Sequence, residues 1–177
     1  ILSEKQKLKL SDELIKNIML CRSYLDDKLQ NEEAPIYGIN TGFGSLYNVK
    51  IEKENLQQLQ ENLVMSHACG IGEEVPQHLV KIMLLLKIKS LSFGHSGVQM
   101  ATVNRLVDFF NNDIFPVIFT QGSLGASGDL APLAHLTLPL IGKGEVWFKG
   151  EKMPTEMLYQ KMHWEPIQLQ SKEGLAL

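Results

Sequence analysis

GSLGASGDL, residues 122–130, is the most informative segment of this 177-residue chain. Three small residues in succession, Ala126, Ser127 and Gly128, stand between an apolar run and an expected helix. Such a triplet can react with itself, because the Gly128 amide nitrogen lies close in sequence to the Ala126 carbonyl carbon. Glycine at position 128 lacks the Cβ that would block the approach and admits backbone angles that other residues avoid. Ring closure with loss of water, then elimination of the Ser127 hydroxyl, would give a methylidene-imidazolone, an electrophile that no ordinary side chain supplies.

The same residues also suit a simpler structure, a turn followed by a helix N-cap, which is the usual role of loops rich in Gly, Ser and Ala. Other reactive-loop motifs do not match. A nucleophile elbow needs a glycine two residues after its serine, where this chain has Asp129. No lysine follows the glycines, as a phosphate-binding loop requires. The triplet alone therefore leaves the turn and the electrophile open.

The longer segment 122–136, GSLGASGDLAPLAHL, resembles the signature of the aromatic amino acid ammonia-lyases, with the histidine ammonia-lyases as the most similar group. The resemblance runs from about Tyr37 to Leu177 and includes two further signatures, YGINTGFG at 37–44 and NLVMSHACGIG at 62–72. It implies that the Ala-Ser-Gly triplet forms the methylidene-imidazolone autocatalytically, with no external cofactor and no metal.

The resemblance also implies roles for residues outside the triplet. Tyr37 is the catalytic tyrosine that takes the β-proton of the substrate, on a loop that lies over the electrophile. Asn40 and Gly44 belong to that closing loop and to the substrate-binding set, and His67 faces the substrate ring. Taken without the resemblance, the segment 37–44 is a surface loop and His67 is a helix-dipole partner or a core residue.

The reaction implied is non-oxidative deamination of L-histidine to trans-urocanate and ammonia. Histidine and tyrosine lyases both have a histidine at the position of His67, whereas phenylalanine lyases generally do not. A tyrosine ammonia-lyase or an aminomutase with the same cofactor therefore stays open, as does a non-catalytic helical fragment. The family implies a homotetramer whose sites draw on three chains. Arg22 and Arg105 are the only arginines and lie in no signature, so we expect these residues alone to be inactive.

Composition excludes several classes of protein. Hydrophobic residues make up 44% and charged residues 21%, which suits a single domain over residues 1–177 with no clear internal boundary. The net charge of −3 argues against a nucleic-acid partner. No apolar run approaches the ~18 residues of a membrane span, and the first residues lack the apolar segment of a secretion signal. Cys21 and Cys69 are expected to be free thiols in a reducing compartment, the cytoplasm. Both ends, Ile1 and Leu177, are expected to be cut.

Hydrophobic periodicity predicts a mainly α fold with a small β-hairpin around Lys149-Gly150. The resemblance implies that this fold is the helical N-terminal portion of an ammonia-lyase. The predicted helices span residues 12–29, 52–69, 75–93, 98–111, 130–140 and 154–162. Residues 114–119 are expected to be irregular, because Pro116 argues against a central strand. Gly70 is expected to end the second helix as a C-cap, and Asp129 to cap the helix that follows the triplet.

Overall fold

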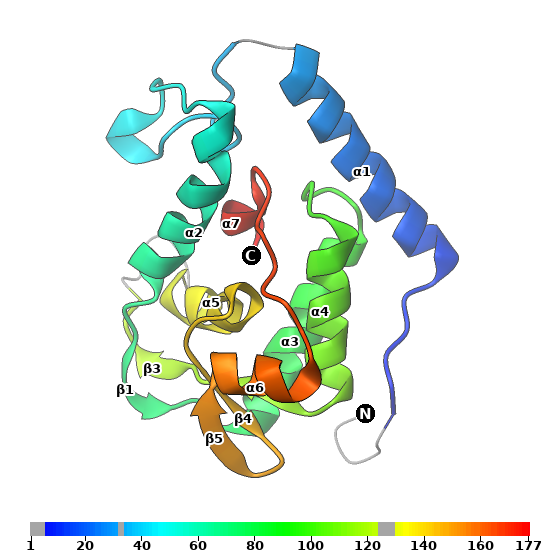
Figure 1. The fold of residues 1–177 in the computed structure, drawn as a ribbon, viewed down its shortest axis with the longest axis vertical. Coiled ribbons are helices and arrows are strands. Elements are labelled where there is room, and N and C mark those ends of the chain that lie inside the picture. Colours follow the sequence, from blue (N-terminus) through cyan, green and yellow to red (C-terminus); the bar gives the residue numbers. More distant parts are fainter. Residues whose placement is uncertain (1–5, 32–33, 124–129) are drawn as a thin grey trace.

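The computed structural model describes residues 6–31, 34–123 and 130–177. It is mainly α-helical, with β1, β3, β4 and β5 gathered at the lower end of the view in Figure 1. This confirms the predicted fold class. The triplet 126–128 and its predicted cap Asp129 lie outside the described residues. Within the described ranges, no helix combines the length and apolar character needed to cross a membrane.

Four long helices form the frame, and each begins and ends within a few residues of the predicted range. They are α1 (Asp12–Asn31), α2 (Leu56–His67), α3 (Gln77–Ser92) and α4 (Met100–Asn111). Helix α1 begins where Ser11 predicts it, because the Ser11 Oγ accepts the Leu14 amide at 3.4 Å.

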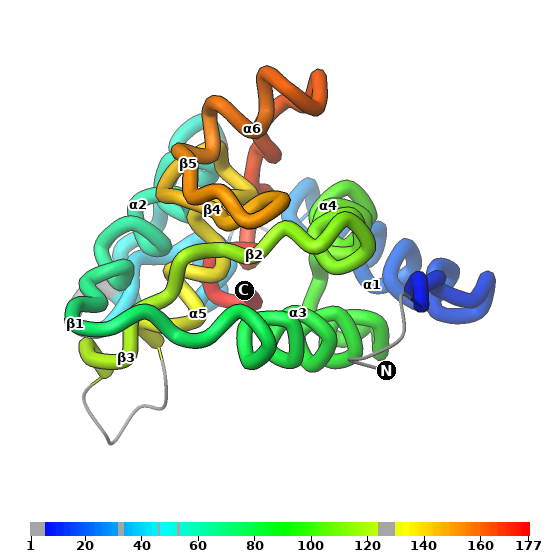
Figure 2. The backbone as a smooth tube through the Cα atoms, turned by 90° about the horizontal axis from the view of Figure 1, so that it is seen from below, coloured from blue at the N-terminus to red at the C-terminus, as the bar shows by residue number. Residues whose placement is uncertain are grey.

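Helices α3 and α4 supply much of the core. Figure 2 shows them side by side, with α1 at the outer edge. Their inward faces bury Leu84, Ile88, Leu106 and Phe109, each no more than 1% exposed. Burial of large aliphatic and aromatic side chains is the main favourable term in folding, at about 25 cal/mol per Å² of apolar surface. These two helices therefore provide the rigid support on which the shorter elements rest.

Shorter helices follow the long ones. They are α5 (Leu130–Thr137), which continues into the 3₁₀ helix η3 (Leu138–Ile141), then α6 (Thr155–Met162) and α7 (Glu173–Ala176). Two further 3₁₀ turns, η1 (Gly44–Leu46) and η2 (Lys53–Asn55), precede α2. Helix α7 was not predicted, because four residues are too few to show a helical period.

The strands form two small sheets. Strand β1 (Ile71–Glu74) pairs antiparallel with β3 (Phe119–Gln121). Strands β2 (Ile114–Pro116), β4 (Glu145–Phe148) and β5 (Glu151–Pro154) form the second sheet in the order β2-β4-β5. The β4–β5 pair is the predicted hairpin.

Two local features of the second sheet follow from residue type. Lys149 and Gly150 have φ of 52° and 81°, the left-handed angles that a two-residue type I′ hairpin turn requires. The prediction of irregular chain over residues 114–119 was wrong for β2, which is an edge strand. Pro116 is tolerated there because it stands at the end of an edge strand.

The prediction that Gly70 caps α2 was also wrong. Helix α2 ends at His67, and the Ala68 amide donates to the Val64 carbonyl at 3.1 Å. Gly70 is instead a point of close approach, since a Cβ there would lie 2.9 Å from the His135 Nε2. The glycine is needed for packing rather than for a left-handed turn.

The segment before Leu177 returns through the middle of the molecule, where Figure 1 shows α7 beside α2. The buried carboxylate of Glu173 accepts hydrogen bonds from the Gln99 and Gln170 amides at 2.9 and 2.7 Å and from the Thr102 hydroxyl at 2.7 Å. The Gly174 amide donates to the Gln60 side-chain oxygen at 2.9 Å. Glu173 thus fastens α7 to the start of α4, and Gly174 fastens it to α2.

Candidate active site

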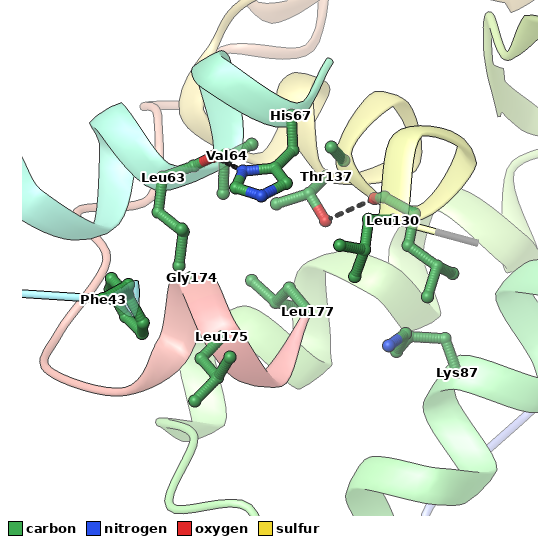
Figure 3. A pocket seen from close by; sticks show the side chains of 12 residues that line it. Phe43, Leu63, Val64, His67, Lys87, Leu130, Thr137, Gly174, Leu175 and Leu177 are labelled. Atoms are coloured by element: carbon green, nitrogen blue, oxygen red, sulfur yellow. Dashed lines mark hydrogen bonds between the residues drawn. The ribbon is translucent and has the colours of Figure 1, made fainter. Parts of the chain in front are cut away.

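A cavity of about 210 Å³ lies between α2, α5 and α7. The walls are mainly aliphatic, with Leu63 from α2, Leu130 from α5 and Leu175 from α7 (Figure 3). His67 and Lys87 bring polar groups to this lining. An apolar cavity with a few polar groups is the usual form of a small-molecule site.

His67 is the residue of this cavity with the clearest chemistry. It is the last residue of α2, and its Nδ1 lies 2.8 Å from the Leu63 carbonyl oxygen and 3.1 Å from the Ser66 hydroxyl. Figure 3 shows the ring over the cavity, with one nitrogen on this carbonyl. Because a carbonyl only accepts hydrogen bonds, the neutral ring carries its proton on Nδ1, which leaves Nε2 as an acceptor.

Tyr37 lies beside the cavity rather than in its lining. Its side chain is 59% exposed, and the edge of its ring contacts Phe43 with the centroids 6.1 Å apart. Phe43 itself lines the cavity. The next residue, Gly38, has φ of +71°, and a Cβ there would lie 2.9 Å from the Leu175 Cδ2. A glycine at position 38 therefore lets the Tyr37 loop rest directly on the cavity wall.

Asn40 has a structural role that the described contacts define. It is 5% exposed, its Oδ1 accepts the Ile36 amide at 2.6 Å, and its Nδ2 donates to the Ala34 carbonyl at 3.1 Å. Gly44 is exposed and begins η1 with φ of +58°. Neither residue is in the cavity lining. Both shape the loop that carries Tyr37, and their part in substrate binding stays a prediction.

The residues on either side of the reactive triplet connect it to this site. Gln121 pairs with Ile71 in the β1–β3 sheet, and a Cβ on Gly122 would lie 2.8 Å from the Gly70 Cα. On the other side, Leu130 begins α5 and lines the cavity. Ala126, Ser127 and Gly128 themselves lie outside the described residues, so their chemistry rests on the sequence.

Sequence reasoning gave no site role to Lys87, and it interpreted His135 only as a packed or supporting residue inside its helix. His135 is 8% exposed, and its Nε2 accepts the Gly70 amide at 2.9 Å. Lys87 lines the cavity and donates to the Ala176 carbonyl at 3.3 Å. Burial lowers the pKa of both side chains. A basic side chain inside an apolar helix is a signal that the sequence shows for both His135 and Lys87. Their hydrogen-bond partners, Gly70 and Ala176, are distant in sequence and could not be predicted from it.

Comparisons with known proteins identify the family to which the chain belongs. A family model described as aromatic amino acid lyase matches residues 1–177. The chain belongs to this family. The histidine ammonia-lyase of Bacillus subtilis is 46% identical over 177 residues, which cover 100% of this chain and 35% of that relative. The chain thus spans about a third of the length of its curated relatives.

Solved structures of aromatic amino acid lyases and of related aminomutases have the same fold. The phenylalanine aminomutase of Pantoea agglomerans matches with a TM-score of 0.91 at 33% identity, over 99% of this chain and 34% of that one. The histidine ammonia-lyase of Trypanosoma cruzi matches with a TM-score of 0.87 at 35% identity, over 97% of this chain and 33% of that one. The helical arrangement is therefore that of the N-terminal part of these enzymes.

Proposed function

We propose that the full-length protein containing these residues deaminates L-histidine to trans-urocanate and ammonia. The observation that carries the proposal is the shared cavity of His67 and Leu130. His67 supplies a ring-nitrogen acceptor, and Leu130 lies two positions after Gly128, the last residue of the Ala-Ser-Gly triplet. The curated relatives named histidine ammonia-lyase, at 44–49% identity, favour this reaction over the others that the family carries out.

The residues around the triplet fit an electrophile made from the chain itself. Gly122 approaches Gly70 so closely that a Cβ would not fit, which brings the start of the segment against the end of α2. Helix α5 begins just after the triplet, and the amides of a helix N-terminus stabilise negative charge. When formed, the methylidene-imidazolone supplies an electron sink for the substrate.

Ring formation consumes only groups of this chain. The Gly128 nitrogen forms a bond to the Ala126 carbonyl carbon, and its proton passes to the carbonyl oxygen. That oxygen leaves as water with the amide proton of Ser127. The Ser127 hydroxyl then leaves with the proton of its own Cα as a second water. The ring thus forms with the loss of two water molecules and needs no other reactant.

Tyr37 is the proposed base for the β-proton of the substrate. A free tyrosine phenol is a poor base at neutral pH, so Tyr37 needs positive neighbours or hydrogen bonds that stabilise its phenolate when substrate binds. The Tyr37 loop contains Gly38 and Gly44, both with positive φ. Within the loop the Tyr37 ring contacts Phe43, and Gly38 lies against Leu175 of the cavity wall. Closure of this loop would exclude water from the proton transfer.

His67 is the proposed contact to the substrate ring. Its Nε2 is an acceptor as long as Nδ1 donates to Leu63, so it suits the N–H of an imidazole. It also suits the O–H of a phenol, and the structural similarity to a tyrosine aminomutase, with a TM-score of 0.90, keeps tyrosine as the second candidate substrate.

Neither arginine of the chain is available to hold the substrate carboxylate. Arg22 pairs with Asp26 and donates to the Gly97 and Ser171 carbonyls. Arg105 stacks on Trp164, 4.6 Å from the ring centroid, and on Tyr159. Both arginines are thus committed to the fold. This supports a site completed by the remaining two thirds of a full-length protein and, in a homotetramer, by neighbouring chains.

A cytoplasmic location is part of the same proposal. Cys21 and Cys69 are both free thiols in the structure, as in proteins of reducing compartments. Neither thiol has a role in the proposed reaction.

The proposed function is tested by offering the full-length protein L-histidine, L-tyrosine and L-phenylalanine separately and measuring ammonia and the organic product. We expect urocanate and ammonia from L-histidine, and neither from a Ser127→Ala variant. Ammonia from L-tyrosine alone would favour the tyrosine lyase, and a β-amino acid without net ammonia would favour an aminomutase. Turnover of none of the three by an otherwise folded protein would favour the non-catalytic reading.

A further inference from the structure

Two glycines meet at the point where the reactive segment begins. A Cβ on Gly122 would lie 2.8 Å from the Gly70 Cα and 3.2 Å from the Ala131 Cβ. The Cys69 thiol lies 3.8 Å from the Gly122 carbonyl oxygen. Residues just before the segment are therefore in contact both with the end of α2 and with α5, the helix just after the segment.

His135 holds this meeting point from the side of α5. Its Nε2 accepts the Gly70 amide at 2.9 Å, and its ring stands edge-on to Phe119 with the centroids 5.2 Å apart. Phe119 lies on β3, which leads into the segment, and His135 lies on α5, which follows it. One imidazole thus connects the two sides of the segment with Gly70.

The ring of His135 is in the protonation state that this contact needs. A backbone amide only donates, so Nε2 must be unprotonated and the ring proton must sit on Nδ1. Burial lowers the pKa of His135, which favours the neutral ring. The cavity-lining residues of α5 are Leu130, Leu133, Ala134 and Thr137, so His135 belongs to another face of that helix and does not reach the substrate cavity.

We propose that His135 is a positioning residue for the maturation of the Ala126-Ser127-Gly128 electrophile, and that it acts by holding Gly70 against Gly122. This inference rests on the proposed function, because it needs the ring to form. Closing a ring between two backbone groups is faster when the segment that carries them is anchored at both sides, since less conformational freedom is then lost in the reaction. The hydrogen bond to Gly70 supplies that anchor.

The test compares two substitutions in the full-length protein. His135→Phe keeps a ring for the contact with Phe119 but removes the acceptor. His135→Gln keeps an acceptor oxygen at the end of a side chain of similar reach. Intact mass spectrometry measures, at set times after synthesis, the fraction of each protein that is two waters lighter than encoded.

We expect the H135F protein to mature about tenfold more slowly than the unchanged protein, the size expected for one lost buried hydrogen bond. The H135Q protein should mature at a rate close to that of the unchanged protein. Leu158→Ala is the matched control, because Leu158 is fully buried on α6, away from these contacts. It should lower the melting temperature without slowing maturation.

The outcomes separate the two proposals. Maturation of H135F at the unchanged rate would overturn the role of His135 and leave the proposed function standing. An unchanged protein at its encoded mass would overturn the electrophile, and with it both proposals. Equal slowing in H135F, H135Q and L158A would mean that stability alone sets the rate, which also overturns the role of His135. Should H135F not fold, His135→Leu replaces it in the same comparison.

Discussion

At the scale of single residues, the resemblance to family signatures carried the site prediction. It singled out Tyr37 and His67, and the structure places one beside the cavity and the other in its lining. Their catalytic roles stay predictions. The hydrogen bond between His135 and Gly70 could not be predicted from the sequence, because the two residues are 65 positions apart and only the tertiary fold brings them together.

The first residue-scale prediction concerns His67. Substitution by phenylalanine removes the ring-nitrogen acceptor, so kcat/KM of the full-length protein for L-histidine should fall about 10- to 100-fold, as for a hydrogen bond lost in a buried site. The measurement is urocanate formation at subsaturating L-histidine.

Ser66→Ala is the matched control for this prediction. It removes the hydroxyl 3.1 Å from the His67 Nδ1 but leaves the bond to the Leu63 carbonyl. We expect a change of less than about threefold, since an exposed hydrogen bond contributes little. An unchanged kcat/KM in His67→Phe would rule out a ring contact.

The second residue-scale prediction concerns the pH dependence of stability. Burial lowers the pKa of His135 in the folded chain below its ordinary value of 6.5. As the pH falls below about 6.5, the unfolded chain takes up a proton before the folded chain does, so the free energy of unfolding decreases. The stability that neutral His135 contributes is fully present above about pH 6.5 and is lost as the pH falls through the pKa of His135 in the folded chain.

Urea unfolding of the chain between about pH 8 and pH 5 measures this effect, because histidine is the side chain that normally titrates in that range. His135→Gln should show a shallower loss of stability than the unchanged chain. The pKa of Glu74 is lowered below its ordinary value of 4.5, chiefly by its hydrogen bond from Lys152. The stability that Glu74 contributes is therefore lost only below about pH 4.5, outside the measured range. Equal slopes in both proteins would contradict the prediction.

At the scale of elements, helix positions followed from hydrophobic periodicity, because each long helix buries residues of one face in the shared core. The strands β1 and β2 and the helix α7 did not follow from the sequence. They have three or four residues each, too few to show a period, and they exist through pairing with distant segments. The hairpin β4–β5 was predictable because its turn is local.

Helix α7 gives the element-scale prediction. The Glu173 side chain is completely buried and accepts hydrogen bonds from Gln99, Thr102 and Gln170. Glu173→Gln would replace one oxygen by an amide group that faces donors, so we expect a loss of about 2–4 kcal/mol in the free energy of unfolding.

Chemical denaturation monitored by circular dichroism measures that loss. Glu151→Gln, at an exposed position of β5, is the matched control and should change stability by less than about 0.5 kcal/mol. A loss at Glu173 no larger than that of the control would mean that α7 is not held by this carboxylate.

At the scale of the whole molecule, the chain is a compact helical third of a larger lyase fold. Its cavity is lined by His67 and by Leu130, the first residue of α5, while Arg22 and Arg105 are engaged in packing and backbone contacts. The sequence predicts that these residues alone form an incomplete site, because the family signatures within them contain no carboxylate clamp, and this stays a prediction.

The whole-molecule prediction is that residues 1–177 alone form no urocanate from L-histidine, since substrate positioning depends on residues beyond them. Purified chain is incubated with L-histidine beside the full-length protein, and urocanate is followed by its absorbance. Turnover by the isolated chain above the level of its Ser127→Ala variant would show that these residues hold a complete site.

The contact between Gln60 and Gly174 also sets an order of events during synthesis. The two residues are 114 positions apart, and at about 5–20 residues per second Gly174 leaves the ribosome roughly ten seconds after Gln60. Throughout that interval the face of α2 that carries Gln60 and Val64, both buried in the final fold, lacks the cover that α7 provides. During synthesis α2 therefore exposes, for several seconds, a face that the finished fold buries, and such transiently exposed surface makes an incomplete chain prone to aggregation.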